Sequence, residues 1–234
     1  MKKHIIVGDI HSNHIGLIKL LNTYDPEDYD YIFLGDYCDY RQENPRVNSN
    51  YIAVMTQIMT AVKNFGAIAL LGNHDDKLIR WFKGNKVEVK EGLSETIFDI
   101  EKERASKNGM TMVDNIKEFL NTLPLLYEKN INGKLYKFAH AYHPLETEIF
   151  ARKNDSTPSE WKKMREHAIY GVPRTPEGER VFWWETGKYL DRITNHIKVA
   201  GHYHLTYFSD KAIILDSTPE IVSYIIEDKK LELW

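Results

Sequence analysis

Five apolar runs in this chain end abruptly in a small residue that is followed at once by Asp, Asn or His. The sharpest change is at residues 67–75, where AIALL runs through a glycine into Asn73-His74-Asp75. The other four endings are Gly8-Asp9-Ile10-His11, Gly35-Asp36-Tyr37-Cys38-Asp39, Ala139-His140 and Gly201-His202-Tyr203-His204. In open α/β sheets, ligands bind beyond the carboxyl ends of the strands, and glycine permits a sharp turn or a close approach there. The pattern predicts that these polar side chains meet at one site.

The first third of the chain predicts an α/β fold with parallel strands. Residues 4–9, 29–36 and 67–73 read as strands, and residues 14–24 and 51–65 have the apolar spacing of helices. Strands that alternate with helices of this size form parallel β-α-β units.

The rest of the chain departs from this alternation. Residues 76–124 predict a helical, cap-like insertion, with a helix over roughly 94–121. Residues 125–141 predict a hairpin that turns at Asn132-Gly133, a strong two-residue turn signal. Residues 142–195 read as irregular. Strands return at 197–202 and 211–216 and in a closing hairpin over 222–234, and a single domain over 1–234 is expected.

Composition narrows the class of protein. A hydrophobic share of 42% and a charged share of 28% are typical of a globular protein, and the net charge of −3 gives no field toward nucleic acid or anionic membranes. The single cysteine excludes an internal disulfide, and the start MKKHIIVGDI lacks the apolar stretch of a signal peptide. No apolar run approaches the roughly 20 residues of a membrane span. We therefore expect a cytoplasmic protein without a membrane association.

The residue types at the five endings favour a metal site. Carboxylate, amide oxygen and imidazole ligands suit manganese, iron, zinc or similar ions, whereas calcium and magnesium sites rarely use so much histidine. Seven candidate ligands exceed the needs of one ion, and a carboxylate can bridge two ions about 3.5–4 Å apart. Each ending alone is also explained by a turn or a helix N-cap. Clustering all five without a ligand is costly, because polar groups would then lack partners.

The motifs, in this order from residue 8 to residue 204, resemble those of the calcineurin-like metallophosphoesterase superfamily. The resemblance implies an α/β fold: a two-sheet β-sandwich flanked by helices, with a two-metal centre between the sheets. It assigns the first ion to Asp9, His11 and His204, the second ion to Asn73, His140 and His202, and the bridging position to Asp36. It further implies a hydrolase in which a metal-bridging hydroxide attacks a phosphate ester. His74 would be the general acid, and Asp39 would fix its tautomer. Manganese is the expected ion, with iron, zinc or nickel as alternatives.

A narrower resemblance concerns the substrate. The segments from 72 to 96 and from 168 to 184 are similar to the phosphatase module of bacterial polynucleotide kinase-phosphatases, and to diadenosine tetraphosphatase-like and Ser/Thr phosphatase-like proteins. This subgroup usually has Asp-Arg-Gly where the present chain has Asp39-Tyr40-Arg41, so a phosphate-clamping arginine is missing. Arg41 or Arg80 is the expected substitute, because a guanidinium suits bidentate contact with phosphate.

A phosphorylated substrate, first of all a nucleotide or an RNA or DNA end, is therefore expected. Diadenosine polyphosphates and phosphoproteins are the alternatives, and a non-catalytic scaffold is a remote one. Basic residues at 77–90 and at 152–165 either steer an anionic substrate or form solvated helix faces. No obligate protein partner is evident.

Overall fold

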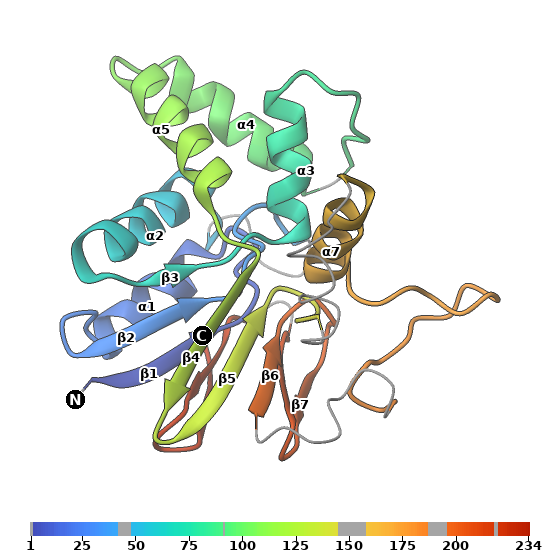
Figure 1. Cartoon of the computed structure of the whole chain (residues 1–234). Helices are drawn as coiled ribbons and strands as arrows, with labels where there is room; N and C mark the ends of the chain where they lie inside the picture. The colour runs from blue at the N-terminus through green and yellow to red at the C-terminus, as the bar shows by residue number, and fades with distance from the viewer. Residues whose placement is uncertain (1, 42–47, 91, 145–157, 187–195, 218–219) are drawn as a thin grey trace.

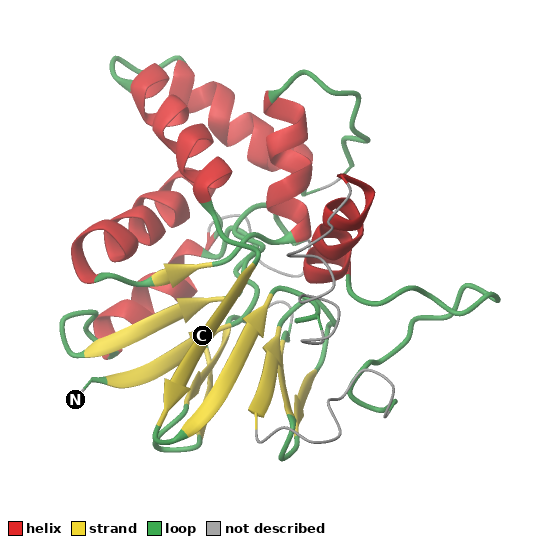
Figure 2. Ribbon diagram, viewed as in Figure 1, coloured by secondary structure: helices red, strands yellow, loops and turns green. Residues whose placement is uncertain are grey.

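Two five-stranded mixed sheets packed face to face, with helices outside them, form the core of the protein (Figures 1 and 2). The computed structural model describes residues 2–41, 48–90, 92–144, 158–186, 196–217 and 220–234. The predicted two-sheet α/β fold is thereby confirmed. In the described part of the chain, no helix has the length and apolar character needed to cross a membrane.

The first sheet has the strand order β10-β9-β1-β2-β3. Its strands are β1 (Lys3–Val7), β2 (Tyr29–Phe33), β3 (Ile68–Ala69), β9 (Val222–Ile225) and β10 (Lys230–Leu233). The pairs β1–β2 and β2–β3 are parallel, as predicted, and α1 (His14–Thr23) and α2 (Tyr51–Phe65) form the crossovers. β9 and β10 form the predicted closing hairpin and pair antiparallel with each other, and β9 also pairs antiparallel with β1.

The second sheet has the order β4-β5-β6-β8-β7. Its strands are β4 (Leu126–Ile131), β5 (Lys134–Ala139), β6 (His196–Ala200), β7 (Thr206–Phe208) and β8 (Ala212–Leu215). The predicted turn is confirmed, because Asn132 and Gly133 have φ angles of 52° and 78°, as a tight hairpin requires. β7 was not predicted, since its three residues are too few to show a period.

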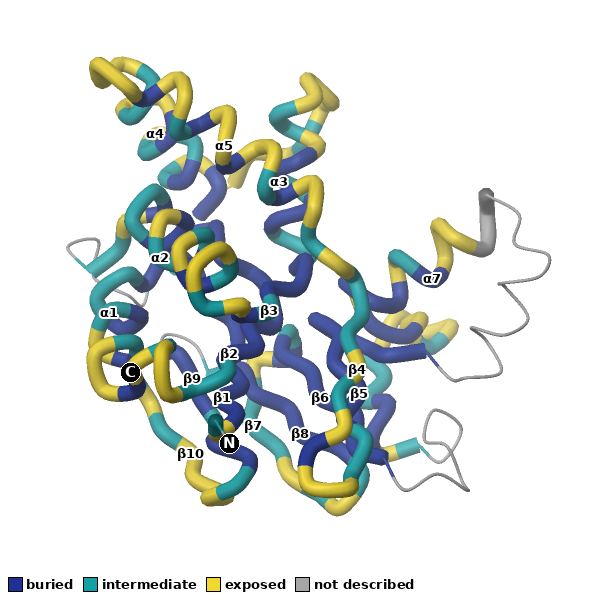
Figure 3. The backbone as a smooth tube through the Cα atoms, turned by 60° about the vertical axis from the view of Figure 1, so that its left-hand side comes forward, coloured by how far each residue is buried: buried dark blue, intermediate teal, exposed yellow. Residues whose placement is uncertain are grey.

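The period-2 alternation of the strands builds three apolar layers. In β1 and β2, Ile6 and Ile32 face the second sheet, whereas Ile5 and Phe33 face the helices. In the second sheet, Val199 of β6 faces the first sheet. The next residue, Ala200, faces outward and packs in a cluster that contains Trp183 and Trp184. Figure 3 shows the result: buried strands lie inside, and exposed residues lie on the outer helix faces. This rigid sandwich holds the loops at the strand ends in place.

Four further helices lie near the carboxyl ends of the strands: α3 (Asn73–Phe82), α4 (Leu93–Arg104), α5 (Gly109–Thr122) and α7 (Pro158–Tyr170) (Figure 1). The region over roughly 94–121 is helical, as predicted, but it forms two helices, α4 and α5, with an interruption at 105–108. A Cβ on Gly109 would lie 1.5 Å from the carbonyl oxygen of Glu103, so only glycine allows this tight connection. The expectation that 142–195 is irregular is wrong for α7, whose weak amphipathic pattern was missed.

Candidate metal centre

The candidate ligands follow β1, β2, β3, β5 and β6 at one edge of the sandwich, in loops or, for Asn73, at the start of α3. Several of these loop residues have left-handed backbone conformations despite carrying side chains. The φ angle is 45° at His11, 54° at Asp36, 62° at Asp39 and 71° at His202. Such conformations cost roughly 1–3 kcal/mol each and are concentrated at functional sites, where the surroundings enforce them.

Two glycines allow the loops to touch one another. A Cβ on Gly72 would lie 2.1 Å from Oδ1 of Asp36, and a Cβ on Gly201 would lie 2.2 Å from Oδ1 of Asp9. Both distances are far below van der Waals contact, so a carboxylate of another loop occupies the space that a side chain would need. The glycines that end these apolar runs are therefore required by the convergence of the loops.

One group of candidate ligands converges on the amide oxygen of Asn73. Nε2 of His140 lies 2.9 Å from this oxygen, and Nδ1 of His202 lies 2.8 Å from it. The same Nε2 of His140 lies 3.4 Å from Oδ2 of Asp36. His140 is held by its other nitrogen, because Nδ1–H donates to the carbonyl oxygen of Leu34 at 3.0 Å. Nε2 is consequently the atom that faces the site.

The other group contains Asp9 and His11 beside Asp36. Nε2 of His11 lies 3.7 Å from Oδ2 of Asp9 and 3.9 Å from Oδ2 of Asp36. Nδ1 of His11 lies within 3.1 Å of the carbonyl oxygens of Cys38 and Asp39, to which an N–H can donate. These carbonyls fix the tautomer, so the lone pair of Nε2 points into the site.

His204 is placed differently from the other candidates. Its side chain is 48% exposed, and its Nδ1 lies 3.8 Å from Oδ2 of Asp216. Its backbone N–H donates to the same carboxylate oxygen at 2.7 Å. Asp216 directly follows β8. Burial is the main cause that raises the pKa of Asp9, and the charge of Asp216 is the second, so Asp216 belongs to the site. The prediction missed it, although the run AIIL before Asp216 has the same abrupt polar ending.

The charges of the site favour a neutral imidazole at His11 and a charged pair of Asp36 and His140. Burial alone would raise the pKa of Asp36, but the nearby His140 and His74 hold it well below its usual range. Burial would lower the pKa of His140, but the carboxylates of Asp36 and Asp9 raise it to about 10. Burial and the charge of Arg41 lower the pKa of His11 far below its usual value. A neutral imidazole is the form that binds metal, so His11 is ready to bind an ion, whereas His140 must release a proton to do so.

His74 and Asp39 form a hydrogen-bonded pair beside the ligands. Nδ1 of His74 lies 2.5 Å from Oδ2 of Asp39, and its Nε2 lies 4.0 Å from Oδ2 of Asp36. Burial lowers the pKa of His74, but the charges of Asp36 and Asp39 outweigh burial and raise it. The Nε2–H of His74 therefore faces the centre and can donate a proton there.

The donor set fits divalent metal ions. A carboxylate oxygen of Asp9, a carboxylate oxygen of Asp36 and a ring nitrogen of His140 lie within 4.8 Å of one another. All three residues are buried. Oδ2 of Asp9 is buried without a hydrogen-bond partner among the described residues. A buried carboxylate oxygen without a partner is costly, and a cation removes that cost. Asp9, His11, Asp36, Asn73, His140 and His202 thus form a candidate set of ligands, with His204 at its edge.

Asp75 is a site residue to which the sequence assigned no role. Its carboxylate accepts from the backbone N–H groups of Asp36 at 2.8 Å, Tyr37 at 3.0 Å and Gly72 at 3.1 Å, with a longer contact to Cys38 at 3.4 Å. It therefore ties the loop after β2 to the loop after β3. Its place in the sequence, third in the first turn of α3, is also typical of ordinary helix capping, which hid this role.

The two predicted substrate arginines lie in different places. Nη2 of Arg41 lies 2.6 Å from Nε2 of His11, inside the centre. Arg80 lies away from it, on α3, where its Nε is 3.2 Å from Oδ2 of Asp76. A third cation was not predicted: Arg180 lies 5.6 Å from the ring of Tyr203, in the segment read as irregular.

The chain belongs to the calcineurin-like phosphoesterase family, whose model matches residues 3–232. It is therefore a hydrolase of a family that uses divalent metals. The family resemblance drawn from the strand endings is confirmed. The roles of the individual residues remain predictions.

The asymmetrical bis(5′-nucleosyl)-tetraphosphatase PrpE of Halalkalibacterium halodurans is 28% identical over 132 residues, which are 52% of this chain and 50% of that protein. The match thus spans about half the length of this relative. A crystal structure described as a candidate diadenosine tetraphosphatase superimposes with a TM-score of 0.61 at 20% identity, over 100% of this chain and 93% of that chain. The structure of a Ser/Thr phosphatase of Saccharomyces cerevisiae superimposes with a TM-score of 0.54 at 15% identity, over 100% of this chain and 79% of that chain. At these identities the two structures establish the fold alone.

Proposed function

We propose that this protein hydrolyses a phosphate ester or phosphoanhydride bond of a nucleotide at a centre of two divalent metal ions. The observation that carries the proposal is the convergence of six candidate ligands that follow five strands, beside a histidine that is held by a carboxylate. Asp36 lies between the two ligand groups and is the proposed bridge. Manganese is the proposed ion, because the mixture of carboxylate, amide and imidazole ligands suits it.

Bound ions would supply charge stabilisation at the phosphate and lower the pKa of a bound water. The residues of the chain provide the remaining steps. Asp39 holds Nδ1 of His74, so Nε2–H is directed at the centre and protonates the departing oxygen. Arg41 lies at the centre with its guanidinium beside His11 and is the proposed contact for a non-bridging phosphate oxygen.

A dinucleoside polyphosphate is the preferred substrate within the nucleotide class. The relative from Halalkalibacterium halodurans is a bis(5′-nucleosyl)-tetraphosphatase by name and matches this chain over about half of its length. RNA or DNA phosphate ends and phosphoproteins are the competing substrates. We also propose that residues 1–234 act as one domain with 76–124 as a helical insertion, because one apolar cluster extends from Ile5 through this insertion to Ile225.

Hydrolysis by the manganese-loaded protein tests the proposal. Diadenosine tetraphosphate, an RNA with a 2′,3′-cyclic phosphate end and a phosphopeptide are offered in parallel to the wild type and to His74→Ala. Loss of a general acid lowers kcat by about 10²–10⁴-fold, while the ligands remain in place, so His74→Ala should still bind manganese. His4→Gln is the matched control, because His4 lies at the opposite end of β1 and should leave kcat unchanged.

Each outcome has a distinct meaning. Turnover of diadenosine tetraphosphate that depends on His74 agrees with the proposal. Turnover of the phosphopeptide alone would make the protein a protein phosphatase. A manganese-loaded protein that turns over none of the three substrates would contradict the catalytic proposal and leave the scaffold alternative.

A further inference from the structure

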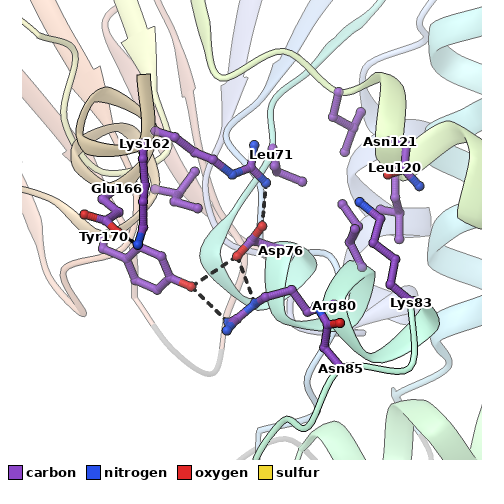
Figure 4. A pocket seen from close by; sticks show the side chains of 14 residues that line it. Leu71, Asp76, Arg80, Lys83, Asn85, Leu120, Asn121, Lys162, Glu166 and Tyr170 are labelled. Carbon is purple, nitrogen blue, oxygen red and sulfur yellow. Dashed lines mark hydrogen bonds and ion pairs between the residues drawn. The ribbon is translucent and has the colours of Figure 1, made fainter. Parts of the chain in front are cut away.

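A large cavity lies between α3, α7 and the end of α5 (Figure 4). Its volume is about 670 Å³. Residues of all three helices line it, among them Asp76, Arg80, Lys83, Arg165 and Tyr170. It brings together α3, which carries part of the metal centre, and α7, which the sequence did not reveal.

The cavity carries an excess of positive charge. Asp76 pairs with two arginines, since Nη2 of Arg165 contacts its Oδ1 and Nε of Arg80 lies 3.2 Å from its Oδ2. Tyr170 completes this wall, because its hydroxyl lies 3.2 Å from Nη2 of Arg80 and 3.3 Å from the same carboxylate. One carboxylate cannot neutralise two guanidinium groups. Lys83 also lines the cavity and forms no ion pair within the part of the chain that the structure describes.

The opposite wall adds one more cation with a weak partner. Lys162 lines the cavity from α7, and its Nζ lies 3.9 Å from Oε1 of Glu166, at the limit of an ion pair. Both side chains are exposed, so this pair contributes little and either group is available to a ligand. Four cations and two carboxylates therefore face the cavity.

Two features relate the cavity to the metal centre: the helix α3 and a second hollow that shares Tyr170 with the cavity. α3 begins at Asn73, and at 1.5 Å per residue Arg80 and Lys83 lie about 10 and 15 Å from it along the helix axis. Tyr170 also lines a second hollow of about 260 Å³, whose wall contains His202 and Arg180. A ligand with its reacting phosphate at the centre can thus extend past Tyr170 into the cavity.

We infer that this cavity binds the distal, non-reacting phosphates of a nucleoside polyphosphate whose reacting phosphate lies at the metal centre. The inference rests on the proposed function and adds to it a preference for substrates with a longer chain of phosphates. The length of α3 between Asn73 and Lys83 suits several phosphate units rather than one. The fork of Arg80 and Arg165 and the point charges of Lys83 and Lys162 are groups that bind phosphate oxygens.

Charge reversal at the lysines tests the inference in the manganese-loaded enzyme. Lys83→Glu and Lys162→Glu should lower kcat/KM for diadenosine tetraphosphate about tenfold relative to kcat/KM for p-nitrophenyl phosphate, which is too short to reach the cavity. Lys163→Glu is the matched control, since Lys163 is exposed on the same helix and does not line the cavity. The ratio for this control should equal the wild-type ratio. Equal losses for both substrates, or equal losses in all three variants, would overturn the inference.

A binding measurement separates this inference from the proposed function. Inorganic tripolyphosphate is titrated calorimetrically into the full chain in the presence of a chelator, which removes the metal ions. Lys83→Glu and Lys162→Glu should weaken binding about tenfold, and Lys163→Glu should not. If the protein hydrolyses none of the substrates but shows this binding pattern, the cavity site is supported and the proposed function is refuted. If the protein is catalytically active but all variants have the same affinity for tripolyphosphate, the cavity site alone is refuted.

Discussion

Replacement of Asp75 by Asn should destabilise the protein more than its single-atom change suggests. The carboxylate accepts four backbone N–H groups, two at each oxygen, from the loops after β2 and β3. Asn keeps one acceptor oxygen and places a donating amide at the other position. At least two buried N–H groups then lose their acceptor, at about 1–3 kcal/mol each, which amounts to about 2–6 kcal/mol.

A second effect works against this loss. Burial and the charge of Asp36 raise the pKa of Asp75 to about 7. The charged form of this carboxylate therefore destabilises the folded protein relative to the unfolded chain. Asn removes that charge. We therefore expect the free energy of unfolding of Asp75→Asn to fall by about 2–4 kcal/mol, in the lower part of the range.

Urea unfolding at pH 7 measures the change, with an unchanged m-value as the check that the unfolded state is the same. Asp99→Asn is the matched control, because Asp99 on α4 accepts a single backbone N–H, that of Tyr51 at the start of α2, at 3.0 Å. The control should lose about 1 kcal/mol. If Asp75→Asn loses no more stability than Asp99→Asn, the role of Asp75 in joining the two loops is refuted.

Two further predictions concern a glycine and an acid. Gly72→Ala should lower the free energy of unfolding by about 3 kcal/mol or more and weaken manganese binding, because its Cβ would lie 2.1 Å from Oδ1 of Asp36. Gly66→Ala, with a φ of 73° but open space around it, should lose only about 1 kcal/mol and keep its metal affinity; equal metal affinities in both variants would contradict the clash. Nε2 of His143 lies 3.3 Å from Oε1 of Glu128, and Nζ of Lys137 lies 3.5 Å from the same oxygen. The contact with His143, together with Lys137, lowers the pKa of Glu128 to about 2. A lowered pKa stabilises the folded protein above pH 4.5, and this contribution is lost as the pH falls toward 2. In urea titrations, Glu128→Gln should be less stable than wild type at pH 7 and equal to it near pH 2; a pH-independent difference would refute the pairing.

The sequence predicted the local elements well where their pattern was long and regular. Residues 51–65 form a helix with the predicted ends, because Asn50 caps its start and Gly66 ends it in a left-handed conformation. The hairpin at Asn132-Gly133 follows from turn chemistry alone. β3 is shorter than expected, with Ile68 and Ala69 only. The N–H of Leu70 still donates to Phe33 of β2, but the N–H of Leu71 donates to Pro124 instead, and α3 begins at Asn73.

The sequence by itself determined which side chains lie at strand ends, and thus the candidate ligands and the family. Turns, caps and apolar periods act over a few residues, so they can be read without a fold. Only the tertiary structure decided that Asn73 meets His140 and His202 across 67 and 129 residues, and that α7 closes a basic cavity over α3. It also placed Arg80 in that cavity rather than at the centre. These contacts depend on how two sheets and their covering helices pack, and packing energy is shared among many residues that are distant in the chain.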